Sequence, residues 1–363
     1  MTERIFEVPQ AVRWDDGRLF LLDQTQLPDR IVEEQQETIE QVWQSIRQLK
    51  VRGAPAIGVA GAYGLVVAMR SRTGLCPERF LEHLRERADY LATARPTAVN
   101  LRWALDRLLT TADDGAKTDA PCILANLEQE AVAIHRQDME LCRQIGLHGM
   151  PLIREGTGVL THCNAGALAT SSLGTATAPM YMAHERGVRF SVFSDETRPL
   201  LQGARLTTWE LQRAGIDVTL ICDAAAAHMM DTGRIDLVIV GTDRVAANGD
   251  VANKIGTLSV AIAARHFGIP FYVACPCSTV DMKTPSGDRI VIEQRDEREV
   301  TGFAGRRAAP QDVKANNPAF DVTPAALLTG LITERGILRP PFDAALRQAY
   351  AEHCGAVAER DGG

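Results

Sequence analysis

Apolar and polar residues alternate differently in the two halves of the chain. In the first third, apolar residues recur every three or four positions over residues 32–50 and 80–92, which predicts two amphipathic helices. Residues 56–69 are a continuous run of small apolar residues and predict a closely packed helix. Ahead of them, Asp16 and Gly17 lie between two apolar runs and predict a tight β-hairpin over 12–22, because Asp-Gly accepts the positive backbone angles of such a turn.

The second half contains five short runs rich in β-branched residues, and each run except the last precedes a helix-like stretch. The runs cover residues 158–161, 189–194, 217–222, 237–240 and 271–274. Parallel strands need crossover connections and have near-continuous apolar character, so this pattern predicts a doubly wound parallel sheet with helices on both faces. The polar loop at 111–121 is the expected boundary. We therefore predict a mainly helical domain over 1–121 and an α/β domain over 122–363.

Charge and composition narrow the possible functions. The formal net charge is −7, and Lys and Arg form no run that could neutralise a row of phosphates, so a nucleic-acid partner is not expected. Residues 1–10 carry Glu3 and Glu7 and lack the apolar run of a signal peptide, and we expect no later stretch to span a bilayer. The eight cysteines are scattered without a paired CxxC spacing. We expect a cytoplasmic protein with reduced thiols, no membrane contact and no zinc site.

Polar residues follow every predicted strand. In open α/β sheets ligands bind beyond the carboxyl ends of the strands, so these residues are the first candidates for chemistry. In chain order they are His162, Cys163 and Asn164, then Asp195 to Arg198, then Asp223, then Thr242, Asp243 and Arg244, and finally Cys275 and Cys277. A thiol, carboxylates, an amide and arginines are thus expected at one edge of the sheet.

Three segments are candidate anion sites, and each has a plainer interpretation. Residues 164–167 read as a helix start that could face an anion, or as a tight turn. In the segment 52–55, Gly53 permits close backbone approach and Arg52 offers bidentate contact to phosphate, although an arginine before a helix is often only solvated. Asn253 and Lys254 follow a polar loop, and the alternative there is a helix start with an exposed lysine.

Cys163 and Asp243 occupy equivalent positions on two predicted strands. A cysteine in a fold is often an inert small hydrophobe, yet one among backbone donors at a strand end can be reactive. Asp243 could equally cap a helix or pair with Arg244. Spacing alone leaves both alternatives open.

Particular strings of residues resemble those of the methylthioribose-1-phosphate isomerases. They are RGAPAIG from Arg52, RPTAVNL from Arg95, HCNAG from His162, ETRPLLQGAR from Glu196 and GTDRVAANGDVANKIGT from Gly241. Further matches run from LLDQTQLP at Leu21 to NPAFDVTP at Asn317 and ITERG at Ile332, in the order of the family. The resemblance therefore covers nearly the whole chain.

The resemblance implies a helical amino-terminal domain, a Rossmann-like carboxyl-terminal domain and a homodimer that uses no metal or organic cofactor. It implies that Asp243 is the proton donor and that Cys163 assists the transition state. The residues that it assigns to sugar-phosphate binding are Arg52, Gly53, Ala54, Arg95, Gln202, Asn253 and Lys254. Cys275 and Cys277 match no catalytic motif of the family and are expected to be structural.

The resemblance implies conversion of 5-methylthioribose 1-phosphate to 5-methylthioribulose 1-phosphate in methionine salvage, with 5-deoxyribose 1-phosphate as a further expected substrate. The wider superfamily also contains ribose-1,5-bisphosphate isomerases and non-catalytic regulatory subunits of a translation-initiation exchange factor. Regulatory subunits are not expected to keep Cys163 and Asp243 together with the full set of phosphate ligands. The bisphosphate isomerases keep the pair, but they must accommodate a charged phosphate where methylthioribose has an apolar thioether.

Overall fold

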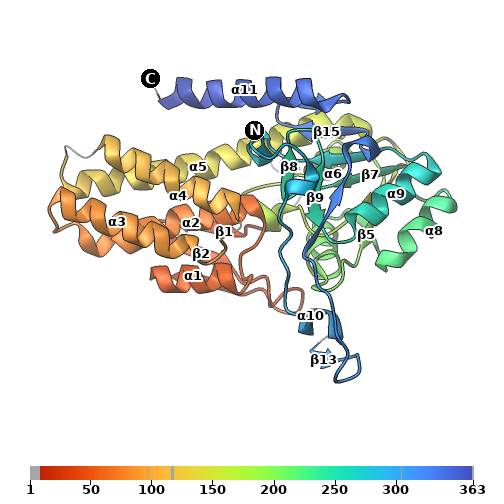
Figure 1. The fold of residues 1–363 in the computed structure, drawn as a ribbon, viewed down its shortest axis with the longest axis horizontal. Coiled ribbons are helices and arrows are strands. Elements are labelled where there is room, and N and C mark those ends of the chain that lie inside the picture. Colours follow the sequence, from red (N-terminus) through yellow and green to blue (C-terminus); the bar gives the residue numbers. More distant parts are fainter. Residues whose placement is uncertain (1–8, 97, 116–117, 304, 362–363) are drawn as a thin grey trace. The chain divides into compact units, whose positions relative to one another are not determined.

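The computed structural model describes residues 9–361 except 97, 116, 117 and 304, so the expectation for residues 1–10 falls mostly outside the described part. The chain divides into two compact units (Figure 1). We call them the amino-terminal unit, which runs to Cys142 and also includes Ala167–Gly174, and the carboxyl-terminal unit, which comprises Arg143–Gly166 and the chain from Thr175 onward.

The amino-terminal unit joins a small antiparallel sheet to five helices. Its strands are β1 (Val12–Asp15), β2 (Arg18–Leu22) and β3 (Glu33–Gln36), and its helices are α1 (Ile39–Arg47), α2 (Ala54–Met69), α3 (Pro77–Ala92), α4 (Val99–Asp114) and most of α5 (Ala120–Gly149). The predicted hairpin is present, with positive φ at both Asp16 (46°) and Gly17 (72°). The helices predicted over 56–69 and 80–92 are confirmed as α2 and α3.

The prediction of one helix over residues 32–50 was wrong for its first part. Residues 33–36 form β3, which pairs with β2 as an edge strand. Helix α1 starts later because Thr38 caps it: the Thr38 side chain accepts from the Gln41 N–H, and the Gln41 side chain accepts from the Thr38 N–H. A strand that is polar throughout shows no apolar alternation, so its pairing was invisible in the pattern.

Helix α2 is the centre of the amino-terminal core. Together with the turn after it, the 19-residue segment Ala54–Arg72 is long and apolar enough to cross a membrane, contrary to the expectation that no stretch would qualify. In the structure 72% of this stretch is buried inside the fold. Glycines along α2 allow close helix contact: a Cβ on Gly58 would lie 2.9 Å from the Asn100 carbonyl oxygen of α4.

The carboxyl-terminal unit is built on a seven-stranded sheet. Its strands are β4 (Gly158–Thr161), β5 (Ser191–Asp195), β6 (Asp217–Ile221), β7 (Leu237–Val240), β10 (Phe271–Ala274), β15 (Gly330–Thr333) and β16 (Gly336–Leu338). Their order across the sheet is β16-β15-β10-β7-β4-β5-β6, and all neighbours are parallel except β15 and β16. The six parallel strands follow the Rossmann order 3-2-1-4-5-6, whose direction reverses between β4 and β7. The predicted fold class is confirmed.

Helices follow the strands as the sequence pattern predicts, and the last of them, α11, comes after the final strand. They are α6 (Ala178–Glu185), α7 (Thr208–Arg213), α8 (Ala226–Asp231), α9 (Thr257–Phe267) and α11 (Phe342–Asp361). Side chains of α8, α9 and α11 pack with the strands in one buried cluster that includes Met230, Val260 and Leu346. Helices α6 and α7 connect the strands on the other side of the reversal, and right-handed crossovers carry such helices to the opposite face.

Smaller elements are inserted around β7 and β10. A second sheet contains β8 (Arg244–Ala246), β9 (Val251–Lys254), β11 (Val280–Asp281) and β14 (Phe320–Thr323), and helix α10 (Arg298–Thr301) precedes the hairpin of β12 (Gly302–Phe303) and β13 (Arg306–Arg307). A π-helical turn covers Gly203–Thr207. Short 3₁₀ turns cover Arg70–Arg72, Met150–Leu152, Ala167–Ala169, Asp223–Ala225, Cys277–Thr279, Gly287–Arg289 and Ala325–Leu327.

The division between the units differs from the boundary expected near Pro121. The change falls after Cys142, within α5, and the polar loop is shorter than expected because α4 continues to Asp114. Leu105 and Leu108 of α4 and Ile123 of α5 belong to one buried cluster. The loop therefore joins two helices of the same core.

Candidate active site

Cys163 and Asp243 follow the two strands at which the sheet order reverses. Strands β4 and β7 are parallel neighbours, with Leu160 opposite Val238. The segments beyond them are in close contact, since a Cβ on Gly241 would overlap the Cβ of Ala165. Ligands of open α/β sheets bind at this reversal point. The fold thus places a thiol-bearing and a carboxylate-bearing segment at the position where a ligand site is expected.

The backbone of Cys163 is held in an uncommon conformation. Its φ is 64°, in the left-handed region, where a non-glycine residue is strained and needs support from its surroundings. Two threonine hydroxyls supply that support: the Cys163 N–H donates to Thr197 Oγ1 at 2.8 Å, and Thr207 Oγ1 donates to the Cys163 carbonyl at 2.6 Å. Strain of this kind gathers at functional sites.

Asp243 lies between β7 and β8, and no helix starts there, so the helix-cap interpretation is wrong. Its N–H donates to the Ala252 carbonyl at 3.0 Å, and Thr242 Oγ1 donates to the same oxygen at 2.8 Å. Arg244 pairs with Asp281 at 3.3 Å. These bonds attach the Asp243 segment to β9, the strand that carries Asn253 and Lys254.

Asn253 and Lys254 end strand β9, so the helix start considered for them is not observed and α9 begins at Thr257. Asn253 is buried, and its amide donates to Thr257 Oγ1 at 3.0 Å. The Lys254 ammonium lies 4.9 Å from the centre of the Phe320 ring. The ammonium of Lys254 is therefore within reach of an aromatic ring while the residue stays partly exposed.

Gln202 lies immediately before the π-helical turn that carries Thr207. Its side chain is buried, and its Oε1 has no hydrogen-bond partner among the residues that the structure describes. A buried amide oxygen without a partner is costly, and a bound hydroxyl group would satisfy it. Ligand contact by Gln202 stays a prediction with which this unpartnered oxygen is compatible.

The remaining predicted binding residues belong to the amino-terminal unit. Gly53 caps α2 with a φ of 90°, and a Cβ there would lie 2.5 Å from the carbonyl oxygen of Ala169. Ala54 is the first residue of α2, and Arg52 and Arg95 are half-buried. The helix start predicted at Arg52 is confirmed, so the free N–H groups of α2 adjoin the Arg52 segment.

Of the two interpretations of residues 164–167, the helix start is not observed and the turn agrees with the structure. This segment ends in the 3₁₀ turn Ala167–Ala169, and α6 begins only at Ala178. The intervening residues Ala167–Gly174 belong to the amino-terminal unit, where Ala169 packs on Gly53. The small residues of this segment therefore pack in the amino-terminal unit, although the strands before and after it belong to the carboxyl-terminal unit. The local sequence does not predict this packing.

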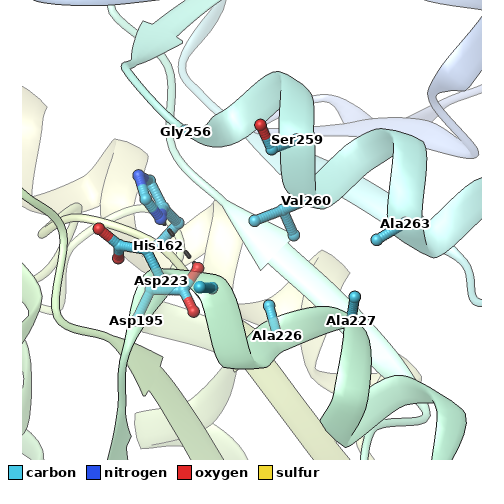
Figure 2. A pocket seen from close by; sticks show the side chains of 10 residues that line it. His162, Asp195, Asp223, Ala226, Ala227, Gly256, Ser259, Val260 and Ala263 are labelled. Atoms are coloured by element: carbon cyan, nitrogen blue, oxygen red, sulfur yellow. Dashed lines mark hydrogen bonds and ion pairs between the residues drawn. The ribbon is translucent and has the colours of Figure 1, made fainter.

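The sequence named His162 and Asp195 only as residues at strand ends, and the structure joins them. His162 Nδ1 lies 2.9 Å from Asp195 Oδ2, and a pocket of about 290 Å³ is lined by both residues together with Asp223 and residues of α8 and α9. Figure 2 shows the three side chains close together at this pocket. Ligand atoms of the three side chains lie within 4.8 Å of one another, a spacing that could hold a metal ion. The sequence pattern did not predict that these three side chains meet, because each of them follows or ends a different strand.

Cys275 and Cys277 follow β10 in the chain and are buried, which agrees with the expected structural role. Burial raises the pKa of both thiols, which keeps them protonated and unreactive. The Cys277 N–H donates to Glu334 Oε2 at 2.9 Å.

These features define a two-unit α/β protein whose Rossmann-order sheet presents a cysteine, an aspartate and buried polar groups at its reversal point. The chain belongs to the Initiation factor 2 subunit family, whose model matches residues 50–340. It is 54% identical over 339 residues to a 5-deoxyribose 1-phosphate isomerase of Bacillus thuringiensis, a match that covers 93% of this chain and 97% of the relative.

Two solved structures are also similar to it. The 5-methylthioribose 1-phosphate isomerase of Pyrococcus horikoshii OT3 is 41% identical with a TM-score of 0.92, covering 97% of this chain and 98% of the other. A protein of A. fulgidus described as the delta subunit of translation initiation factor eIF-2B is 42% identical with a TM-score of 0.86, covering 94% and 99%. The chain is thus similar both to proteins named as isomerases and to a protein named as an initiation-factor subunit.

Proposed function

We propose that this chain is an aldose–ketose isomerase that acts on a pentose 1-phosphate. The observation that carries the proposal is the position of Cys163 and Asp243 on either side of the sheet reversal, in a chain closely similar to named isomerases. In the proposal, 5-methylthioribose 1-phosphate and 5-deoxyribose 1-phosphate are both substrates. The proposed substrate-binding residues are Arg52, Gly53, Ala54, Arg95, Gln202, Asn253 and Lys254.

The substrate sets the chemical task. Its anomeric oxygen carries phosphate, so the ring cannot open as a free hemiacetal does, and the bond from C1 to the ring oxygen must break with protonation of that oxygen. We assign this proton to Asp243 as general acid. A hydrogen then moves from C2 to C1 while the C2 hydroxyl loses its proton and becomes the carbonyl. The reaction is an isomerisation, so its atoms and electrons balance within the substrate.

Cys163 serves the hydrogen transfer in one of two ways. If the hydrogen leaves C2 as a proton, the Cys163 thiolate is the base and an enediol forms. If it moves as a hydride, Cys163 shields and stabilises a cationic carbon in a site that excludes water. In both routes the left-handed backbone of Cys163, clamped by two hydroxyls, fixes where its sulfur lies.

The competing function is that of a non-catalytic exchange-factor subunit. The solved relative that is described as such a subunit is 42% identical to this chain, so it is similar in sequence as well as in fold. The presence of Cys163 and Asp243 together with the proposed phosphate ligands favours an isomerase, because a scaffold subunit is not expected to keep both sets of residues.

Relative turnover of three sugars tests the proposal. Removing the thiomethyl group loses about 1.6 kcal/mol for two heavy atoms, so kcat/KM for 5-deoxyribose 1-phosphate should fall roughly fifteenfold from that for 5-methylthioribose 1-phosphate. Ribose 1,5-bisphosphate should be poorer by about a hundredfold or more, because a site for an apolar group would desolvate an unpaired phosphate. Turnover should need no added metal and should survive a strong chelator.

Other results would reassign the chain. A preference for the bisphosphate would move it to that sister activity. Absence of turnover with all three sugars, together with a stable complex with initiation-factor subunits, would establish the scaffold function instead. The proposal also includes a cytoplasmic location and a homodimer, and light scattering on the purified chain measures the assembly.

A further inference from the structure

The ring of His162 lies between two hydrogen-bond acceptors, one residue before Cys163. Its Nε2 is 2.8 Å from the Ile255 carbonyl oxygen, and its Nδ1 is 2.9 Å from Asp195 Oδ2. A carbonyl oxygen only accepts, so Nε2 carries a hydrogen. A bare imidazole nitrogen and a bare carboxylate repel at 2.9 Å, so a positive centre must lie between Nδ1 and Oδ2. The local geometry therefore demands either a second proton or a metal ion.

The charges around the ring favour holding a proton. Asp195 on β5, Asp223 after β6 and Asp321 on β14 all act on His162, and Glu196 adds its charge beside Asp195. Burial lowers the pKa of His162, but the hydrogen bond and charge of Asp195 and the Ile255 carbonyl outweigh this effect and raise it. Burial also raises the pKa of Asp195. The raised pKa values of His162 and Asp195 both favour retention of the proton between His162 Nδ1 and Asp195 Oδ2.

The same ring bridges two parts of the candidate site. It packs on Gly256, where a Cβ would lie 2.8 Å from the imidazole Cε1. Gly256 is fixed on its other side, since its N–H donates to Asp321 Oδ2 at 2.7 Å. Ile255, which accepts the Nε2 hydrogen, directly follows Lys254. The imidazole thus connects the end of β4 to the turn that follows β9.

We propose that His162 is a positioning residue for the isomerase proposed above, kept protonated on both ring nitrogens by Asp195. Its ring fixes the position of Cys163, at the end of β4, relative to the turn after Lys254. The Cys163 thiol and the proposed phosphate-binding residues can then contact the same bound sugar. The buried proton is essential to this arrangement because Nε2 must donate to the Ile255 carbonyl, and Nδ1 and Oδ2 need a proton between them. Asp195 Oδ1 is buried and has no hydrogen-bond partner among the described residues, so the carboxyl group meets the ring through Oδ2.

Histidine-selective ¹⁵N NMR of the wild-type chain tests the protonation directly. Of the eight histidines, one should keep both ring nitrogens protonated at a pH where an exposed imidazole is neutral, and His162→Gln should remove that signal. A neutral imidazole pattern for His162 at pH 7 would overturn the proposal. So would a stoichiometric metal ion in the purified protein that His162→Gln loses, because a metal would then occupy the space assigned to the proton.

Kinetics of Asp195→Asn test the positioning role. The amide can still donate to a neutral ring, so packing is conserved while the second ring proton is lost. We expect kcat to fall about tenfold or more, KM to change less than threefold, and the melting temperature to stay close to wild type. Ser259→Ala is the matched control, since Ser259 is an exposed residue that lines the same pocket (Figure 2) and should leave kcat/KM within twofold.

The two proposals fail in different ways. Wild-type turnover with an unchanged kcat in Asp195→Asn would refute the positioning role and leave the isomerase intact. No wild-type turnover with any pentose 1-phosphate would refute the isomerase, and the NMR experiment would still decide whether the pair holds its proton. A large effect of Ser259→Ala would identify the pocket as a ligand site and overturn the assignment of its polar groups to positioning.

Discussion

Thr197 accepts a hydrogen bond from the backbone N–H of Cys163 at 2.8 Å, and its hydroxyl donates to the Asp195 carbonyl at 3.1 Å. The hydroxyl thereby links the ends of β4 and β5. Two backbone N–H groups, of Thr197 and Arg198, in turn donate to the carboxylate of Asp223, each at 2.7 Å. The backbone of Cys163, the candidate catalytic cysteine, is thus held by Thr197, which follows the neighbouring strand β5.

Replacement of this hydroxyl should reduce turnover. Thr197→Val keeps the side-chain shape but leaves the Cys163 N–H without its acceptor, so the left-handed backbone relaxes and the sulfur moves. We expect kcat to fall about tenfold with little change in KM. Thr197→Ser keeps the hydroxyl and should retain most of the activity. Equal losses in the two variants would show that packing, rather than the hydrogen bond, sets the effect.

The proposed catalytic pair should be sensitive to minimal changes. Cys163→Ala and Asp243→Asn should each lower kcat by about a hundredfold or more, because a general acid or base contributes about 10² to 10⁴. Steady-state kinetics and circular dichroism together measure the loss and check the fold. Cys142→Ala provides a comparison at a buried cysteine of the amino-terminal unit. Near-wild-type turnover in either variant of the pair would remove that residue from the mechanism.

The proposed phosphate ligands should behave differently from the pair. Arg52→Ala and Lys254→Ala each remove a charged donor, and such hydrogen bonds contribute about 1.5 to 3 kcal/mol, so KM should rise roughly tenfold to a hundredfold. Lys283→Ala, at an exposed lysine, is the control for a simple loss of charge. If KM stays constant while kcat collapses, these residues act in the chemical step instead.

Gly53 should tolerate no side chain. Its φ of 90° and the Ala169 backbone at 2.5 Å leave no room for a Cβ, so Gly53→Ala should displace the start of α2 and raise KM while lowering the melting temperature. Gly156→Ala is matched for positive φ, 81°, but has open space around it. Its effect should be limited to the strain of the left-handed backbone. Similar losses in both variants would mean that the contact with Ala169 is unimportant.

A buried carboxyl group makes a pH-dependent contribution to stability. Burial raises the pKa of Asp138 to about 6, while the Ser171 hydrogen bond partly opposes this. A folded-state pKa above the unfolded value means that the stability contribution is complete below about pH 4 and is lost as pH rises through about 6. The shift of about two units corresponds to roughly 3 kcal/mol.

Asp138→Asn should therefore gain stability relative to wild type between pH 4 and 7. The amide still accepts from the Ser171 N–H and cannot ionise. Urea unfolding at both pH values measures the difference, and Asp29→Asn, at an exposed position, should show none. A difference between Asp138→Asn and wild type that does not change with pH would contradict the buried ionisation.

Local sequence determined the elements whose signals lie within a few residues. Asp16 and Gly17 supply the positive φ angles of the first hairpin, and the apolar runs from Gly158 and Leu237 become buried parallel strands. Because the residue after each such strand lies at the ligand-binding edge, the sequence could also place Cys163 and Asp243 together. Family strings then supplied roles for them that spacing alone left open.

Tertiary structure decided the features that depend on contacts between distant segments. Strand β3 is polar and exists only because β2 offers it an edge. The segment after Cys163 forms a 3₁₀ turn instead of an α-helix, and its residues Ala167–Gly174 belong to the amino-terminal unit. His162 and Asp195 are 33 positions apart and become partners through the pairing of β4 with β5. Periodicity reports which side of a strand is buried, but it carries no information on which buried group will meet which, since that is fixed by the order and register of the strands in the sheet.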